Sequence, residues 1–213
     1  MIGLTINSDD PVDLLFLGAH CDDIEIGCGG TLLKLIRNYS VRSVNWVVFS
    51  SNEIRKTEAL RSAGEFLSGV PEKHISVLDY KDGFLPTNEY DIKSYFEQLK
   101  ATCKPSIIFT HYRDDRHQDH RLISNLTWNT YRNHLILEYE IPKYDGDLGV
   151  PNFFVELDDG TIAEKNRIIL ESFKSQAEKH WFDHETFNAI LRLRGMESAV
   201  KFAEGFYARK ISF

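Results

Sequence analysis

Two short stretches of this chain bring imidazole and carboxylate side chains together in a pattern that suits a metal ion. They are Gly18-Ala19-His20-Cys21-Asp22-Asp23 and His117-Gln118-Asp119-His120. Two neutral imidazoles and one carboxylate form a mixed nitrogen and oxygen ligand set that suits zinc. Three protein ligands also leave a fourth coordination position open for water, as in catalytic rather than structural zinc sites. The pattern therefore favours a mononuclear zinc centre that supports hydrolysis.

We predict His20, Asp23 and His120 as the ligands. His20 and Asp23 are three residues apart, so one turn of chain can direct both side chains at one ion. The second stretch supplies the third ligand, His120. Zinc is the expected metal, although the same donors could hold another divalent transition metal.

The other polar residues of the two stretches could serve the reaction. Asp22 lies beside the predicted ligands, where a carboxylate can accept a proton from water that the ion has made acidic. His117 shares a face with His120 if a helix starts here, and it could stabilise an oxyanion or protonate a leaving group. Asp119 could orient one of the imidazoles through a hydrogen bond.

Both stretches follow segments with the pattern of buried β-strands. Val12–Leu17 is a short, nearly all apolar run closed by Gly18, and Ser106–Thr110 is a second such run. In open α/β sheets, ligands bind in the crevice outside the carboxyl ends of the strands. Two strand ends could therefore bring the two halves of one site together.

The rest of the chain alternates between predicted strands and helices. We therefore predict one domain over residues 1–213 with an α/β fold, a three-layer, Rossmann-like, mostly parallel sheet with helices on both faces. The further predicted strands are Val44–Phe49, His74–Leu78, Leu135–Ile141 and Asn152–Glu156, and the predicted helices are Gly29–Asn38, Thr57–Leu67, Tyr90–Thr102, His120–Asn133, Ala163–Phe173 and Glu185–Phe202.

Three alternatives do not require a catalytic metal. Asp22 or Asp23 could cap a helix that begins near Thr31. The segment Gly27-Cys28-Gly29-Gly30-Thr31 could be a turn that cradles phosphate in a nucleotide-binding module without hydrolysis, although it lacks the full dinucleotide spacing and a Walker lysine. The third alternative is a metal-binding regulatory protein without turnover. Such a protein would be expected to have metal ligands without a neighbouring base, whereas Asp22 supplies a base here.

Composition limits the class of protein and its partners. A net charge of -7 argues against binding to nucleic acid, because that role needs clustered positive charge. Three cysteines without framework spacing suit a reducing compartment. No apolar stretch reaches the roughly 18 residues of a membrane span, and Met1–Leu4 lacks a basic region before an apolar core. We expect a cytoplasmic protein.

The two stretches and their neighbours resemble the LmbE-like, or PIG-L, zinc deacetylases. Ala19-His20-Cys21-Asp22-Asp23 is similar to the family's Ala-His-Pro-Asp-Asp signature, and His117-Gln118-Asp119-His120 is similar to its His-x-Asp-His motif. Three further segments resemble the family: Arg55-Lys56-Thr57-Glu58-Ala59, the acidic turn Asp82-Gly83, and a closing segment with Arg194-Gly195 and Tyr207 that is similar to the branch of bacillithiol-type deacetylases.

The resemblance implies removal of the acetyl group from an N-acetylated amino sugar or its conjugate, a small-molecule substrate. It implies zinc at His20, Asp23 and His120, a general base at Asp22 and stabilisation of the tetrahedral intermediate by His117, in agreement with the assignment from the residues. It leaves room for a homo-oligomer, although no interface can be identified in the sequence.

The resemblance also implies two substrate contacts, Arg55 near anionic groups and Asp82 near sugar hydroxyls. Each residue has a simpler explanation. Arg55 and Glu58 are three residues apart and could form a solvated ion pair on a helix. Asp82-Gly83 is a common turn dipeptide.

Cys21 stands where the family usually has proline. Its thiol could be a zinc ligand or an oxidation site, but we expect a buried, inert cysteine, as for Cys28 and Cys103. Six other residues remain unassigned because such residues usually belong to the core: Trp46, Trp128, Tyr139, Glu140, Asn152 and Trp181.

Overall fold

A seven-stranded sheet forms the centre of the computed structural model, which describes residues 11–211. The strand order is β3-β2-β1-β4-β5-β7-β6; neighbours from β3 to β5 are parallel, and β7 is antiparallel to both β5 and β6. Met1–Leu4, considered above, lies outside the described residues. The strands are β1 (Val12–Gly18), β2 (Val41–Ser50), β3 (Glu72–Tyr80), β4 (Ile107–His111), β5 (Leu135–Tyr139), β6 (Phe153–Glu156) and β7 (Ala203–Ala208).

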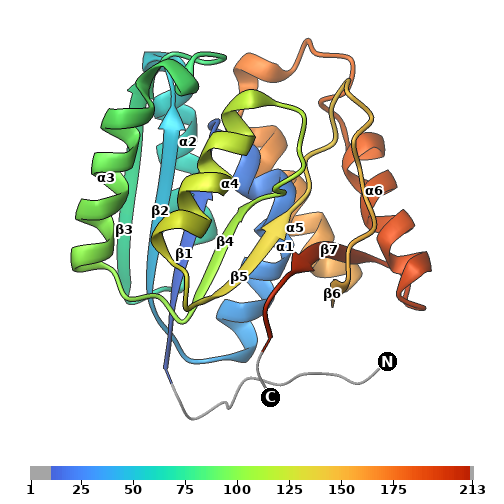
Figure 1. The fold of residues 1–213 in the computed structure, drawn as a ribbon. Coiled ribbons are helices and arrows are strands. Elements are labelled where there is room, and N and C mark those ends of the chain that lie inside the picture. The colour runs from blue at the N-terminus through green and yellow to red at the C-terminus, as the bar shows by residue number, and fades with distance from the viewer. Residues whose placement is uncertain (1–10, 212–213) are drawn as a thin grey trace.

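Helices cover both faces of this sheet, as Figure 1 shows. Helices α1, α2 and α5 pack together on one face, α3 and α4 cover the other, and α6 packs against β7. This arrangement confirms the predicted α/β class with its mostly parallel sheet. The helices are α1 (Asp23–Asn38), α2 (Glu53–Phe66), α3 (Glu89–Thr102), α4 (Gln118–Thr130), α5 (Asp159–Ser172) and α6 (His184–Glu197), with short 3-10 helices η1 (Leu85–Asn88) and η2 (Lys174–Gln176).

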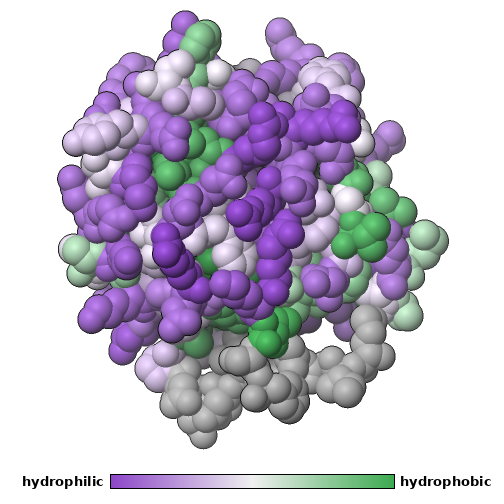
Figure 2. Space-filling view, in the orientation of Figure 1, coloured by the Kyte–Doolittle hydropathy of each residue, from purple (hydrophilic) through white to green (hydrophobic). Residues whose placement is uncertain are grey.

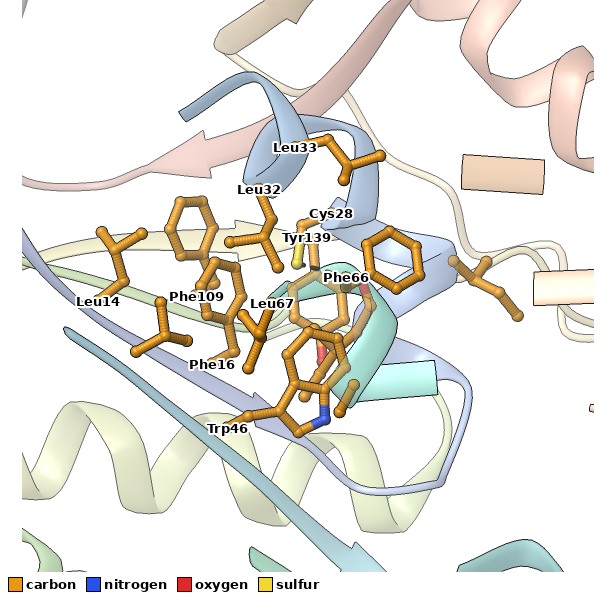
Figure 3. Close-up of a cluster of buried hydrophobic side chains, with 14 of the residues drawn as sticks. Leu14, Phe16, Cys28, Leu32, Leu33, Trp46, Phe66, Leu67, Phe109 and Tyr139 are labelled. Carbon is orange, nitrogen blue, oxygen red and sulfur yellow. Dashed lines mark hydrogen bonds between the residues drawn. The ribbon is translucent and has the colours of Figure 1, made fainter. Parts of the chain in front are cut away.

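The central strands are buried on both faces, which explains why they are almost continuously apolar. In β1, Leu14 and Phe16 point into the core under α1 and α2, and the alternate residues Leu15 and Leu17 point into the core under α3 and α4. Figure 3 shows part of the first core, where the Phe16 and Phe109 rings stack. The sheet is thus a rigid support, and the polar loops at its edge carry the chemistry.

The alternative of a glycine-rich turn at residues 27–31 is wrong, because this segment lies inside helix α1, which begins six residues before the predicted start at Gly29. The glycines allow close packing instead: a Cβ on Gly27 would lie 2.2 Å from the Tyr139 ring, and one on Gly30 would lie 2.5 Å from Leu157. The backbone N–H groups of Gly30 and Thr31 donate to the Glu204 carboxylate at 2.9 and 2.6 Å. These donors are occupied within the protein, which removes the basis for a phosphate cradle here.

The prediction of one helix from Glu185 to Phe202 is also wrong at its end. Helix α6 ends at Glu197, the chain passes through Ala199 with a φ of 61°, and the missed strand β7 follows. This strand contains a glycine and the buried polar Glu204, so its sequence lacks the pattern of a core strand. The other predicted elements that the structure contains differ from their observed bounds by a few residues, apart from the start of α1.

Figure 2 shows a mostly hydrophilic face on which hydrophobic residues form small, separate groups. Among residues 11–211, no helix combines the length and apolar character needed to cross a bilayer.

Candidate active site

The two polar stretches meet at the carboxyl ends of β1 and β4, which are adjacent and parallel. His20 follows the end of β1, and Asp23 is the first residue of α1. His117 is the N-cap of α4, which places His120 in its first turn. The structure therefore brings together residues about a hundred positions apart, at the sheet edge where α/β proteins bind ligands.

The three predicted ligand atoms converge at distances that suit zinc. His20 Nδ1 lies 3.1 Å from His120 Nε2 and 3.2 Å from Asp23 Oδ2, and the last two atoms are 3.5 Å apart. Tetrahedral zinc with bonds of about 2.0–2.2 Å requires ligand atoms roughly 3.3–3.6 Å apart. The residues present therefore fit a zinc ion with little rearrangement. The same cluster also offers three overlapping groups of donors: His20, His117 and His120; Asp23, His111 and His120; and His20, Asp82 and Asp119.

Carboxylates hold the far nitrogen of each ligand imidazole. His120 Nδ1 lies 2.9 Å from Asp115 Oδ2, and His20 Nε2 lies 3.3 Å from Asp119 Oδ2 and 3.1 Å from Asp82 Oδ1. Such partners fix the ring orientation and the tautomer of a metal-bound histidine. Asp119 is itself held by the backbone N–H groups of Gly83 and Leu85 at 2.7 and 3.1 Å.

The two ligand imidazoles have opposite pKa shifts. Burial, together with the nearby His111, lowers the pKa of His120 to about 4, which keeps this ring neutral and able to donate a lone pair. Burial also disfavours protonated His20, but the carboxylates of Asp23, Asp119 and Asp82 outweigh it and raise the pKa of His20 well above its usual range. Metal binding at His20 must therefore displace a proton.

Asp22 is buried beside the ligands and forms an ion pair with Arg55, with 2.8 Å between Oδ1 and Nη2. Asp22 occupies the N-cap position of α1, but its side chain makes no capping hydrogen bond. A capping role therefore does not explain this residue. Arg55 Nε is 3.9 Å from Glu58, so the expected helix-surface ion pair is only a loose contact, and Glu58 instead accepts hydrogen bonds from Ser175.

His117 has the geometry of a hydrogen-bond donor that faces the site. Its Nδ1 accepts the backbone N–H of Asp119 at 3.3 Å, so the neutral ring carries its proton on Nε2. Its ring lies 4.9 Å from that of His20 and 4.6 Å from that of His120. Burial and the two neighbouring imidazoles lower the pKa of His117, which keeps the ring in this neutral form.

Comparison with known proteins places this arrangement in a family. Residues 15–131 match the model of the family described as PIG-L: GlcNAc-PI de-N-acetylase. This match covers more than half of the chain and includes both polar stretches. The chain belongs to the PIG-L family. It is 31% identical over 140 residues to an uncharacterized deacetylase, YaiS, of Escherichia coli, covering 61% of this chain and 74% of that protein.

Solved structures share the fold of this PIG-L protein. The conserved protein TT1542 from Thermus thermophilus superimposes with a TM-score of 0.72 at 21% identity, covering 95% of this chain and 96% of the other. The N,N'-diacetylchitobiose deacetylase from Pyrococcus horikoshii gives a TM-score of 0.66 at 21% identity, covering 92% and 83%. At these identities the similarity establishes the fold.

A cavity of about 380 Å³ opens above the candidate ligands of the PIG-L protein. Its polar lining residues include Asp22, His117 and the three ligands, and its apolar and aromatic lining residues include Ile141, Pro142, Tyr144 and Trp181. A second cavity of about 510 Å³ shares His20, Arg55, Asp82 and Gln176 with the first. Asp82, whose side chain is 76% exposed, is one of the residues that line both cavities.

The six residues that we left unassigned have different surroundings. Trp46, Trp128, Tyr139 and Glu140 are buried, Trp181 lines the cavity, and Asn152 is exposed. Glu140 accepts hydrogen bonds from Arg194 and Tyr207, which the sequence analysis singled out in the closing segment. These two residues form a buried network and do not line the cavity that contains the ligands.

Cys21 is buried, as are Cys28 and Cys103, in agreement with the expectation of inert thiols. The Cys21 thiol donates to the Ser50 carbonyl at 3.3 Å, and burial raises its pKa to about 12. The cysteine in place of the family's proline thus lies against β2 rather than among the ligand atoms.

Three residues of this site were not predicted from the sequence. Asp115 Oδ2 contacts His120 Nδ1, Lys143 Nζ lies 2.8 Å from the same Asp115 oxygen, and His111 lies at the end of β4 against Asp23. A metal-ligating histidine usually donates its second N–H to a carboxylate, and this rule could have directed attention to Asp115, five residues before His120. Lys143 lies 23 positions after His120, and no local pattern connects the two.

Proposed function

We propose that this protein is a zinc-dependent hydrolase that removes the N-acetyl group from an N-acetylated amino sugar or its conjugate. The observation that carries the proposal is the convergence of ligand atoms of His20, Asp23 and His120 within 3.5 Å of one another, with Asp22 and His117 in the lining of the same cavity. Membership of the PIG-L family supports the deacetylase chemistry.

Zinc, when bound by these three residues, would supply Lewis acidity that polarises the amide carbonyl and makes water more acidic. Asp22 accepts a proton from the water that attacks the carbonyl carbon, and the Arg55 guanidinium holds the carboxylate in place for this role. The His117 Nε2–H donates a hydrogen bond to the oxygen on which negative charge develops. Asp22 then passes its proton to the amine nitrogen as the C–N bond breaks, which yields acetate and a free amino sugar.

Arg55 and Asp82 are proposed substrate contacts. Both lie where the two cavities join, so either could contact a sugar bound over the ligands. Asp82 also approaches His20, and a sugar hydroxyl would compete for this exposed carboxylate. The second cavity, which shares these lining residues, leaves room for a group attached to the sugar and so favours a conjugate as substrate.

The central experiment measures zinc content together with acetate release. The wild-type protein should bind one zinc ion and release acetate from an N-acetylglucosamine conjugate, and chelation should abolish turnover until zinc is restored. Asp22→Asn should retain zinc and lose about 10²- to 10⁴-fold in kcat. Glu58→Gln is the matched control, since it alters another carboxylate near Arg55 that lies outside the cavity lining.

Two results would refute the assignments separately. Turnover by Asp22→Asn at the wild-type rate would exclude Asp22 as the base. Unchanged zinc stoichiometry in His120→Ala would remove His120 from the ligand set. Zinc binding without acetate release from free, nucleotide-linked, lipid-linked or thiol-linked N-acetyl sugars would favour the alternative of a metal-binding protein without turnover.

A further inference from the structure

We propose that His111 is a positioning residue for the metal centre, because its Nε2 accepts the backbone N–H of Ala19 and so fixes the loop that carries His20 and Asp23. The inference rests on the proposed zinc site. His111 is the last residue of β4 and is fully buried, and the family motif residues quoted above do not include it.

The hydrogen bond from Ala19 ties one half of the site to the other. The donor and acceptor are 2.9 Å apart and 92 residues apart in sequence. The carbonyl on the same residue, Ala19, accepts the N–H of Ser50 at 2.8 Å, so both backbone polar groups immediately before His20 are held. A ligand loop held in this way has lost most of its conformational freedom before metal binds.

His111 also supports the ligand from the second half. Its ring stacks on that of His120 with 3.9 Å between centroids and 13° between planes. Its Nε2 also packs 3.2 Å from Asp23 Oδ2, an oxygen held by the His20 backbone N–H at 2.6 Å, but no proton joins these two acceptor atoms. The buried His111 ring thus contacts the predicted ligands His120 and Asp23 directly, and it contacts the backbone N–H of the residue before His20.

The hydrogen bond from Ala19 also indicates that His111 supports the ligands and is not itself a ligand. The Ala19 N–H points at the Nε2 lone pair, which is the electron pair that a metal would need. His111 also lies outside the lining of the cavity above the ligands, whereas His20, Asp23 and His120 all belong to it. The group of Asp23, His111 and His120 is therefore not the metal site, and the proposed ligands remain His20, Asp23 and His120.

The test separates hydrogen bonding from ring packing. His111→Phe keeps an aromatic ring but removes the acceptor, and His111→Leu removes it with a smaller side chain. His111→Gln restores an acceptor near the Nε2 position without the ring. Thr110→Val is the matched control, because it removes a buried hydrogen bond, to Thr127, from the neighbouring residue of the same strand. Zinc dissociation constants are measured by chelator competition, and folding is checked by thermal unfolding of the zinc-free proteins.

The expected result is a loss of zinc affinity of about 10- to 100-fold in His111→Phe and His111→Leu, with His111→Gln within about threefold of wild type. Thr110→Val should melt at a lower temperature but keep its affinity. Wild-type affinity in the folded Phe or Leu variant would overturn the inference, as would an equal loss in Gln and Phe. Failure of the wild-type protein to bind zinc would instead refute the proposed function itself.

Discussion

Replacing Asp115 by asparagine should weaken zinc binding without unfolding the protein. The Asp115 carboxylate accepts three hydrogen bonds: Oδ2 from His120 Nδ1 at 2.9 Å and Lys143 Nζ at 2.8 Å, and Oδ1 from the His117 backbone N–H at 2.7 Å. Burial opposes its ionisation, but the bonds from His120 and Lys143 outweigh burial and hold the pKa of Asp115 well below its usual range. The wild-type group is therefore charged wherever zinc binds.

In the Asp115→Asn variant, the positions of the three donors determine the orientation of the asparagine side-chain amide. An NH₂ group at the Oδ2 position would face two donors, so the asparagine should keep oxygen there and place NH₂ against the His117 N–H. That orientation leaves one backbone donor unpaired, at a cost of about 1–3 kcal/mol, and turns the bond to His120 from a charge-assisted one into a neutral one of roughly half the strength. A weaker partner makes the imidazole less basic, and the expected loss of zinc affinity is about 10- to 100-fold, or roughly 1.4–2.8 kcal/mol.

Competition with a chelator of known affinity measures this change, and thermal unfolding of the zinc-free protein shows that the variant is folded. Asp147→Asn is a closely matched control. The Asp147 carboxylate also accepts a lysine bond, from Lys143 at 2.7 Å, and a backbone N–H, from Arg116 at 2.6 Å, but it does not contact His120. The zinc affinity of the Asp147→Asn variant should stay within about threefold of wild type. Equal affinities for Asp115→Asn and wild type would refute the reasoning, and equal losses in both variants would attribute the effect to Lys143.

Three further perturbations have defined outcomes. Arg194→Met should destabilise the protein by about 3–5 kcal/mol in urea unfolding, because it leaves the buried Glu140 without its guanidinium, and a change below about 0.5 kcal/mol would contradict this. Asp158→Ala removes the N-cap of α5 and should cost about 1 kcal/mol at pH 7. Since the backbone N–H of Thr161 lowers the pKa of Asp158, this stabilisation is present above the ordinary aspartate pKa and is lost as pH falls through the lowered value, so mutant and wild type should converge in acid. Trp181→Ala should raise KM about 3- to 10-fold with little change in kcat if this cavity wall contacts the conjugate, whereas a fall in kcat alone would place its role elsewhere.

The predictable parts of the fold were those with strong local patterns. The runs before His20 and His111 are apolar because β1 and β4 are covered on both faces, so sequence alone located these strands and the loops that follow them. The glycine-rich start of α1 misled the prediction, since glycine usually breaks helices. Its glycines are explained by the close approach of Tyr139 and Leu157, which come from distant parts of the chain.

Strand β7 was missed for a related reason. Its polar residue Glu204 is stabilised by the Lys165 ammonium at 2.7 Å and by two N–H groups of α1, none of which is near it in sequence. A strand whose buried polar residue is stabilised by distant partners does not show the hydrophobic sequence pattern of a strand.

For the site, the residue types and their spacing sufficed to propose His20, Asp23 and His120 as ligands, with Asp22 and His117 beside them. These proposals depend on short-range facts, namely which donors suit a metal and how far apart they are along one turn of chain. The tertiary structure alone decided which groups orient them: Arg55 on Asp22, Asp115 on His120, and His111 on the loop before His20. Hydrogen bonds act over about 3 Å, so a partner far away in sequence becomes identifiable only when folding brings its atoms within that distance.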